Sequence, residues 1–401
     1  MRVVAAIACL LLAPFAPSPC AAGVVEDVVA VAGKYGAGPL AVRTLAIVSL
    51  AMFDAANAVE HRYQPYLAPA PPPPATDTDQ AAIGAGCAAL AALLPAQDAA
   101  IAKDCDAIRQ EPNEAAAAGR RFGATVGRAH ADARKGDGMG APNAYRPYAA
   151  PGVYVPTTLP LGFDAATARP FALKSPAQFR ADPPPALTSE RWARDYNETK
   201  TMGRREGSQR SAEQTATALF FASAGAQQFL DSMATIPLAN AGGTVDRARY
   251  FALVYMTLFD AGIALFDSKY TYNVWRPITA IRNGDLDGND ATARDATWLP
   301  LVDTPMHPEY PCAHCLTGAA FATIVMAFVG DGNALPLRSA AVPGQTPTVR
   351  EFRSARDVGA MIGDARVYGG VHFRVSTETG SAMGIAVAEY VLATQLRPVG
   401  R

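Results

Sequence analysis

The sequence predicts an all-α protein on three observations. Alanine-rich segments whose apolar residues recur with the helical period dominate the chain. No region alternates apolar and polar residues for long enough to indicate a sheet. Two helix starts, Ser211 with Gln214 and Thr348 with Glu351, have the spacing of a capping box, in which side chains satisfy free N–H groups.

The periodic segments place the expected helices along the whole chain. They are predicted over residues 39–59, 79–94, 113–135, 189–206, 211–223, 245–267, 315–329, 349–368 and 377–395. About 380 residues follow the N-terminal leader described below, which is enough for a large core in one domain or two packed ones.

Two proline-rich segments interrupt the helices. Residues 69–74 resemble a polyproline spacer, and residues 136–187 form a long irregular stretch. Aromatic residues within that stretch predict that it packs over the helices: Tyr145, Tyr148, Tyr154, Phe163, Phe171 and Phe179. We therefore expect N-terminal helices and the irregular segment over residues 23–187, and a C-terminal helical bundle over residues 188–401.

The first residues have the pattern of an export signal. Arg2 precedes an apolar run over residues 3–15, and Cys20-Ala21-Ala22 forms a small-residue cleavage site. The run is shorter than the ~20 residues of a membrane span, so a removable signal peptide over residues 1–22 is favoured over a membrane anchor. Because Asp260 interrupts residues 251–266, we expect no further span and a periplasmic or secreted protein.

The overall charge excludes a general electrostatic attraction to nucleic acid. Lysine and arginine total 35 against 36 acidic residues. Any functional positive charge must therefore be local.

Three short segments in the last third of the chain concentrate cationic and imidazole side chains. They are Lys269 to Arg276-Pro277, Pro311-Cys312-Ala313-His314, and Arg366 to His372. A tetrahedral oxyanion needs fixed cations, and guanidinium groups match its paired oxygens well. Imidazole can act as nucleophile, ligand or proton donor. The order of the segments therefore predicts an oxyanion pocket.

Together these segments resemble the signature of the vanadium-dependent haloperoxidase and PAP2-type acid phosphatase superfamily, written KxxxxxxRP, PSGH and SRxxxxxH. Residues 49–57, 183–187, 195–198 and 275–282 are also similar to stretches in bacterial vanadium haloperoxidase-like proteins. The resemblance implies the helical bundle of the vanadium chloroperoxidase and PAP2 type, in one large domain or two packed bundles.

The chain departs from the signature at three positions. Cys312 and Ala313 replace the serine and glycine of PSGH, and Ala365 replaces the serine before the last arginine. In the family these serine and glycine positions help to hold equatorial oxygens of the bound anion.

The resemblance implies a role for each site residue. Lys269, Arg276 and Arg366 would neutralise vanadate, and His372 would be its protein ligand. His314 would handle protons while hydrogen peroxide and halide react to give hypohalous acid.

Two alternatives remain at the level of the sequence. In a PAP2-type phosphatase acting on a phosphate ester, phosphate would occupy the same pocket, His372 would form a phosphohistidine, and His314 would protonate the leaving alcohol. The replacement of serine by Cys312 also leaves open a degenerate member that only binds phosphate.

Local sequence predicts the geometry of the pocket. Pro277 disfavours helix at Arg276, so Lys269 and Arg276 are expected on an irregular segment rather than at a solvated helix end. His314 precedes an apolar helical run whose first N–H groups would point toward an anion. Gly369-Gly370 are expected to end a helix and turn His372 back toward the pocket, although close helix packing would also explain them.

The other histidines carry weaker signals. His307 lies seven residues before His314, where it fits either a second site histidine, as in the family's bromoperoxidases, or a surface turn. His61 and His130 are interpreted as ordinary helix-end or helix-surface residues.

Four cysteines remain after the leader. Cys87 and Cys105 can pair in an oxidising compartment. Cys312 and Cys315 fit a local disulfide or two buried thiols better than a redox or zinc motif.

Overall fold

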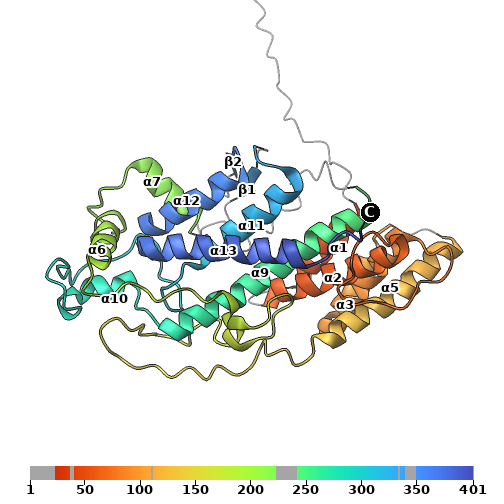
Figure 1. The fold of residues 1–401 in the computed structure, drawn as a ribbon, viewed down its shortest axis with the longest axis horizontal. Helices are drawn as coiled ribbons and strands as arrows, with labels where there is room; N and C mark the ends of the chain where they lie inside the picture. Colours follow the sequence, from red (N-terminus) through yellow and green to blue (C-terminus); the bar gives the residue numbers. More distant parts are fainter. Residues whose placement is uncertain are drawn as a thin grey trace, which may run out of the picture.

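The computed structural model describes residues 23–36, 40–109, 112–222, 242–332, 335–338 and 349–400. Helices dominate these residues, so the predicted all-α class is confirmed (Figure 1). The predicted signal peptide over residues 1–22 lies outside the described residues. The division into residues 23–187 and 188–401 stays a prediction.

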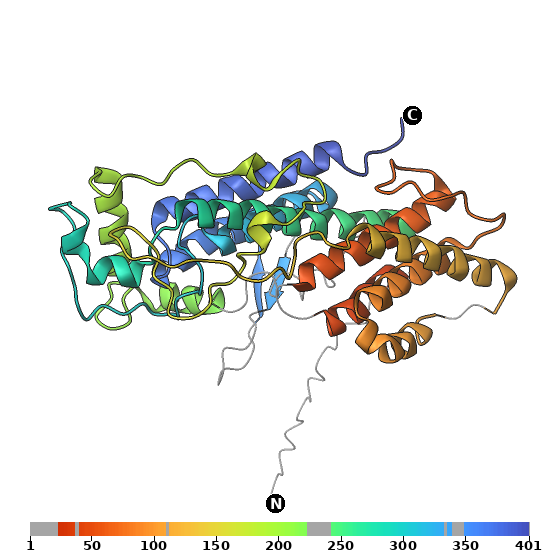
Figure 2. The same cartoon turned by 90° about the horizontal axis from the view of Figure 1, so that it is seen from below.

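The N-terminal part of the chain forms a bundle of five helices (Figure 2). They are α1 (Val24–Tyr35), α2 (Ala41–Glu60), α3 (Thr78–Leu93), α4 (Asp98–Asp106) and α5 (Glu114–Ala133). A Cβ added to Gly123 or Gly127 of α5 would collide with the backbone of α3. These two glycines therefore let the two helices pack backbone to backbone.

The rest of the chain forms a second group of helices with one small sheet (Figure 1). The helices are α6 (Glu190–Met202), α7 (Ala212–Phe220), α9 (Thr244–Tyr272), α10 (Pro277–Arg282), α11 (Ala313–Val329), α12 (Ala355–Tyr368) and α13 (Arg374–Thr394). The sheet pairs β1 (Leu335–Arg338) with β2 (Val349–Phe352) in antiparallel register.

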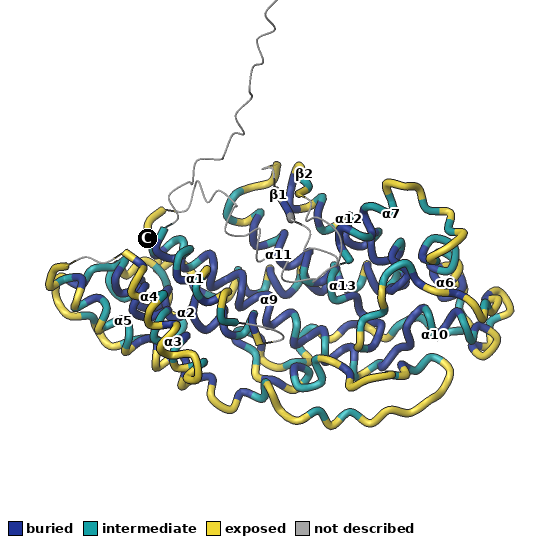
Figure 3. The backbone as a smooth tube through the Cα atoms, turned by 180° about the vertical axis from the view of Figure 1, so that it is seen from behind, coloured by how far each residue is buried: buried dark blue, intermediate teal, exposed yellow. Residues whose placement is uncertain are grey.

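Helix α9 connects the two groups. It has 29 residues and packs against α2 at one end and against α11 and α13 along its length. Figure 3 shows α2 and α9 buried along most of their length. One continuous core therefore includes residues from both groups.

The irregular segment over residues 136–187 is held by hydrogen bonds to a buried carboxylate of α9. Asp260 accepts from the backbone N–H groups of Phe171 at 2.7 Å, Ala172 at 2.7 Å and Leu173 at 2.9 Å. Burial raises the pKa of Asp260 to about 6 although these donors lower it. The prediction that the segment packs over the helices is therefore confirmed.

Ring contacts add to this packing. Phe171 lies 5.1 Å from Phe259 of α9, and Phe179 lies 5.6 Å from Tyr390 of α13, measured between ring centroids. Tyr148 is the exception among the aromatic residues singled out from the sequence, because it is 60% exposed.

Several predicted elements differ from the structure. Residues 349–352 form strand β2 rather than helix, and α12 begins only at Ala355, where Ser354 caps it by accepting from the N–H of Asp357. The capping box predicted at Thr348 and Glu351 is therefore wrong at Glu351, which lies in β2. Thr348 lies outside the described residues. Each strand has four residues, too few for a period of two to stand out in the sequence.

The first capping box is confirmed, with Ser211 and Gln214 bonded reciprocally at the start of α7. Helices α1, α4 and α10 were not expected. Both α4 and α10 are short, at 9 and 6 residues, and packing rather than periodicity determines them.

Within the described residues, two helices are by length and composition apolar enough to cross a membrane, so the expectation that no segment after residue 22 is long and apolar enough is wrong. They are α2 and α9, and a third candidate, α3 with the segment through Asp106, is bent by 109°. The apolar windows of α2 and α9 are 78% and 83% buried within the protein. The absence of a membrane span stays a prediction.

His130 is a second correction. It is buried rather than on a helix surface, and its Nε2 lies 2.9 Å from Oδ2 of Asp54 in α2. The same carboxylate accepts from the N–H groups of Tyr66 and Leu67. The pair therefore joins α2, α5 and the segment that follows α2. His61, as expected, lies at a helix end, where it caps α2 in the left-handed conformation.

Candidate functional site

Lys269 lies on the last turn of α9, not on an irregular segment as predicted. The helix continues to Tyr272 and ends at Asn273, which is in the left-handed conformation. The Lys269 ammonium is fully buried and donates to the carbonyl oxygens of Pro308, Glu309 and Pro311. Lys269 therefore fixes the segment that leads into α11.

Arg276 is extended at the N-cap of α10, as Pro277 predicted. Its Nε donates to the carbonyl oxygen of His307 at 2.8 Å, and its Nη1 donates to that of Val371 at 2.9 Å. The same Nη1 lies 3.2 Å from Nε2 of His372, and Nη2 lies 3.0 Å from Nδ1 of His307. Arg276 therefore brings two of the predicted segments together.

The Pro311–His314 segment leads directly into a helix, as predicted. Cys312 is the N-cap of α11, so Ala313 and His314 lie in the first turn, where N–H groups have no acceptor within the helix. Cys312 forms a disulfide with Cys315. A Cβ on Gly380 of α13 would collide with the Cys312 backbone, so α13 packs directly on this loop.

The Gly369-Gly370 pair ends α12, as predicted. Tyr368 is the last helical residue, and Gly370 has a φ of +75°, which favours glycine. The turn places His372 in the core with no exposed surface. Arg366, on the last turn of α12, is 2% exposed and donates to the carbonyl oxygen of Phe221 at 3.1 Å.

Sequence reasoning missed Glu309. This buried residue accepts from Nδ1 of His372 at 2.8 Å and from the N–H of Phe373 at 3.0 Å. The Ser376 hydroxyl lies 3.3 Å from the same ring nitrogen. The one available signal was a carboxylate between two candidate site histidines. Glu309 fixes the ring so that Nδ1 carries the hydrogen and Nε2 presents its lone pair.

His307 belongs to the site rather than to a surface turn, because its ring contacts Arg276. Burial lowers its pKa well below the ordinary value, and the charges of Lys269 and Arg276 lower it further. This shift favours the neutral form of His307.

The pKa values of the two other candidate histidines shift in the same direction. Burial lowers the pKa of His372 well below its ordinary value, and the charges of Arg276, Lys269 and Arg366 lower it further. Burial also lowers the pKa of His314 well below its ordinary value, and the charges of Arg366, Arg276 and Lys269 lower it further. The three cations therefore surround both rings closely enough to act on them.

Burial disfavours the charged forms of the three basic side chains. Burial lowers the pKa of Arg276 to about 10, and burial together with Arg276 lowers that of Arg366 to about 9. Burial and Arg276 lower the pKa of Lys269. The charge of Glu309 raises the pKa values of Lys269 and Arg276. Burial raises the pKa of Glu309 itself to about 7.

These residues fit a tetrahedral oxyanion such as vanadate or phosphate. Nε of Arg366 and Nε2 of His314 are buried without a hydrogen-bond partner within the described part of the chain. An anion with several oxygens would supply acceptors to these groups and offset the three cations. The donor set of guanidinium, ammonium and imidazole groups suits an oxyanion rather than a bare metal cation.

The positions that depart from the family signature offer no hydroxyl to such an anion. Cys312 is held in the disulfide, and Ala365 is buried in α12. Backbone N–H groups at the start of α11 remain as donors on that side.

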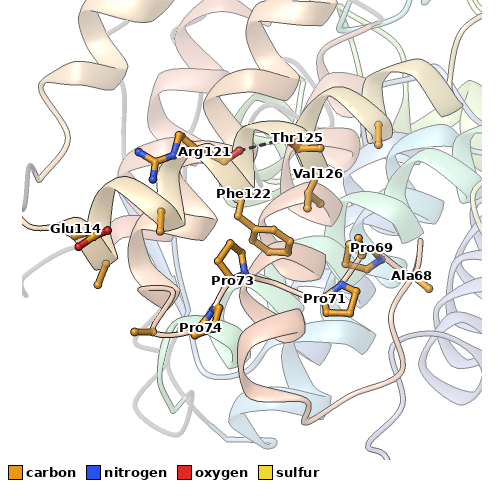
Figure 4. Close-up of a pocket in the computed structure, with 15 residues that line it drawn as sticks. Ala68, Pro69, Pro71, Pro73, Pro74, Glu114, Arg121, Phe122, Thr125 and Val126 are labelled. Atoms are coloured by element: carbon orange, nitrogen blue, oxygen red, sulfur yellow. Dashed lines mark hydrogen bonds between the residues drawn. The ribbon is translucent and has the colours of Figure 1, made fainter.

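A larger hollow, of about 960 Å³, lies away from this site. It lies between residues 68–75 and α5. Figure 4 shows the proline rings of this segment beside Phe122 of α5. Only Glu114 and Arg121 carry charge among the residues that line it. This hollow therefore lacks the groups that chemistry on an anion requires.

The comparisons with known proteins agree with the fold. Residues 249–400 match the family model of the VCPO second helical-bundle domain. The vanadium chloroperoxidase of Curvularia inaequalis is 29% identical over 189 residues, which covers 39% of this chain and 30% of that protein. Residues 249–400 are therefore similar to the second helical-bundle domain of vanadium chloroperoxidases.

Solved structures extend the likeness in fold beyond the matched domain. A bacterial vanadium-dependent iodoperoxidase has a TM-score of 0.76 and 20% identity, covering 94% of this chain and 96% of that one. An apo-type bacterial vanadium-dependent chloroperoxidase has a TM-score of 0.68 and 19% identity, with the same coverage. The matched region nevertheless spans less than a third of the Curvularia protein.

Proposed function

We propose that the protein is a vanadium-dependent haloperoxidase, which oxidises halide with hydrogen peroxide at a histidine-bound vanadate. The arrangement around His372 carries this proposal. Its Nδ1 is committed to Glu309 at 2.8 Å, and its Nε2 faces the Arg276 guanidinium. A ring held in this way directs its Nε2 lone pair toward Arg276, so an oxyanion held by that guanidinium would lie beside this nitrogen.

Arg276 and Arg366 would hold the vanadate oxygens and His372 would be its protein ligand. Lys269, whose ammonium donates to three carbonyl oxygens, would add charge and fix the loop that precedes α11. Bound vanadate would supply Lewis acidity toward hydrogen peroxide. The buried guanidinium groups remain charged near pH 7, because even the lowered pKa values of Arg276 and Arg366 are about 10 and about 9. They would stabilise negative charge on the oxygens throughout the reaction.

His314 would accept a proton from the incoming peroxide and return it to the departing oxygen. Burial lowers its pKa and so favours the neutral ring, the form that can accept a proton, in the absence of an anion. The negative charge of a bound anion would offset the three cations and raise that pKa toward the range needed for proton exchange. Its unpartnered Nε2 supports this role.

The proposed reaction takes place outside the cytoplasm, in the periplasm or in the medium. Two disulfides, Cys87–Cys105 and Cys312–Cys315, support this location, because disulfides persist in oxidising compartments.

The test is bromination of a phenol indicator by vanadate-loaded protein with hydrogen peroxide. We expect turnover in the wild type and a loss of about 100-fold or more in His314→Ala, since general acid–base groups contribute about 10² to 10⁴. Both proteins should retain the same helical circular dichroism.

Two other outcomes would contradict the proposal. Hydrolysis of phosphate esters by metal-free protein, with no halide oxidation by the vanadate form, would identify a PAP2-type phosphatase. Tight phosphate binding without either activity would identify a degenerate member.

A further inference from the structure

The Cys312–Cys315 disulfide closes the first turn of α11. Cys312 is the N-cap, and its Sγ accepts from the backbone N–H of Cys315 at 3.1 Å. Both cysteines are fully buried. Ala313 and His314 lie between them, so the disulfide restricts the backbone of the two residues that follow the N-cap.

Contacts from α13 hold the same turn. The N–H of Cys312 donates to the carbonyl oxygen of Ser376 at 3.0 Å, and the Ser376 hydroxyl lies 3.3 Å from Nδ1 of His372. A Cβ added to Gly380 would collide with the Cys312 carbonyl oxygen. The turn that the disulfide closes is therefore connected through Ser376 to the histidine proposed as the protein ligand.

Buried groups without a hydrogen-bond partner lie on this turn and close to it. Among the described residues, Nε2 of His314 and Nε of Arg366 are two such atoms. Arg366 lowers the pKa of His314 more than the other cations do, so its guanidinium lies close to the turn. The first N–H groups of a helix also have no acceptor within the helix. An oxyanion would provide acceptors for these groups.

The disulfide also determines what Cys312 can offer to an anion. A disulfide sulfur has no hydrogen to donate, whereas a serine hydroxyl can donate and is a good N-cap. The donors on this side of the site are therefore backbone N–H groups and the His314 ring. Their contribution depends on being held in place before the anion binds.

We propose that the Cys312–Cys315 disulfide is a positioning element of the anion site. It holds the first N–H groups of α11 and the His314 ring in place, and so replaces the hydroxyl that the signature serine would provide. The inference rests on the anion site of the proposed function and adds to that site a requirement for an oxidised cysteine pair.

The requirement makes the anion affinity depend on the redox state of the pair. Reduction adds two electrons and two protons to the S–S bond and leaves two thiols. Hydrogen peroxide would restore the disulfide, since two thiols and one peroxide give a disulfide and two waters.

The first experiment distinguishes this disulfide from Cys87–Cys105. Cys87→Ala together with Cys105→Ala leaves only the disulfide of α11, and inorganic phosphate, which thiols do not reduce, is the probe. By calorimetric titration this variant should bind phosphate within about twofold of the wild type, because distant sites act independently. After reduction with dithiothreitol and desalting without oxygen, its affinity should fall about tenfold or more, the usual effect of loosening a group that orients a site. Hydrogen peroxide should restore the affinity.

The second experiment separates positioning from stability with two variants that both lack the disulfide. Cys312→Ala with Cys315→Ala also lacks a capping group, so it should bind phosphate about tenfold more weakly than the wild type. Cys312→Ser with Cys315→Ala restores a capping hydroxyl, so it should bind within about threefold of the wild type, with or without dithiothreitol. Circular dichroism should show the same helical content in both variants.

A third measurement needs no anion. The N–H groups of Cys312, Cys315 and Leu316 all have acceptors, so their deuterium exchange reports the order of the turn. In anion-free protein, exchange over residues 312–316 should be about tenfold faster in the alanine pair than in the wild type, while exchange in α5 should not change.

Three outcomes would overturn the inference and leave the anion site in place. They are an unchanged phosphate affinity after the disulfide is opened, an equal loss of affinity in the alanine and serine variants, and unchanged exchange rates over residues 312–316. An absence of phosphate and vanadate binding by the oxidised wild type would instead overturn the anion site itself, and the inference with it.

Discussion

Among the described residues, two buried histidine–carboxylate pairs have nearly the same N···O distance, made through different ring nitrogens, and different surroundings. Nδ1 of His372 lies 2.8 Å from Glu309, and Nε2 of His130 lies 2.9 Å from Asp54. Around His372 are three buried cations that lower its pKa, and its second ring nitrogen faces Arg276. Asp54 instead receives two backbone N–H groups and joins separate elements.

The difference shows that the pair alone does not define a site. A carboxylate orients an imidazole in both cases, but only at His372 do the neighbours create an excess of positive charge that an anion can offset. The first pair is suited to ligand binding, and the second to joining parts of the N-terminal bundle.

The largest expected effect separates the two histidines. His372→Ala should lower bromination by about 10³-fold or more and abolish tight vanadate binding, because the protein ligand is lost. His130→Ala should leave activity within about twofold while lowering the free energy of unfolding by about 1–3 kcal/mol, since Asp54 loses a buried partner. Calorimetric titration and chemical denaturation measure the two effects. Equal loss of activity in both variants would remove the distinction.

A second experiment addresses the cations. Arg366→Ala should weaken vanadate or phosphate binding by about 10²-fold, the effect of losing a buried charged hydrogen bond of about 2–3 kcal/mol. Arg43→Ala is the control, because Arg43 pairs with Asp137 at 2.8 Å in the N-terminal half of the chain. Its anion affinity should not change. Unchanged titration curves for both variants would show that the pocket lies elsewhere.

The carboxylates of the two pairs, Glu309 and Asp54, can be compared by replacing each with its amide. Glu309→Gln should weaken anion binding by about 10–100-fold, the usual effect of altering a group that orients a ligand histidine. Asp54→Asn should leave binding unchanged and affect stability alone. Titration of both variants at one pH tests this, and a loss of affinity in Asp54→Asn would contradict it.

The smallest expected effect is on the pH dependence of stability. The folded-state pKa of Glu309 is raised from 4.5 to about 7, so the folded chain binds more protons at this residue between those values. Its contribution to the free energy of unfolding therefore falls as pH rises through that window. Glu309→Gln removes this slope, so the variant should gain stability relative to the wild type as pH rises from about 4.5 to about 7.

The measurement is thermal unfolding of both proteins without anion across that range. Taking the difference cancels the opposite slope from the histidines with lowered pKa values. Parallel curves would indicate that Glu309 is ionised in both folded and unfolded chains.

The sequence predicted which cationic and imidazole residues lie near one another better than it predicted the elements that carry them, while their binding of an anion stays a prediction. Lys269, Arg276 and Arg366 lie close enough to His314 and His372 to lower the pKa values of both rings, and Pro277 and Gly369-Gly370 are local signals for the segments that carry them. Lys269 was nevertheless expected beyond the end of its helix, since no proline or glycine marks the last turn of α9. Its position depends on three carbonyl oxygens from a segment about 40 residues away.

Glu309 and His130 were missed for a related reason. A buried carboxylate or imidazole is recognised by its partner, and both partners are distant in sequence: Glu309 is 63 residues from His372, and His130 is 76 from Asp54. The strand at residues 349–352 was missed because pairing with β1, rather than its own four residues, determines it.

Helix α9 makes it difficult to cut the protein into two pieces that fold separately. Its 29 residues span about 43 Å at 1.5 Å per residue, and its sides form part of the core in both halves of the molecule. A fragment that starts at residue 188 would expose the apolar surface that α2 now covers, so it should aggregate rather than fold. Intact protein should instead melt in a single calorimetric transition, and cutting the backbone within residues 136–187 should leave two pieces that stay associated.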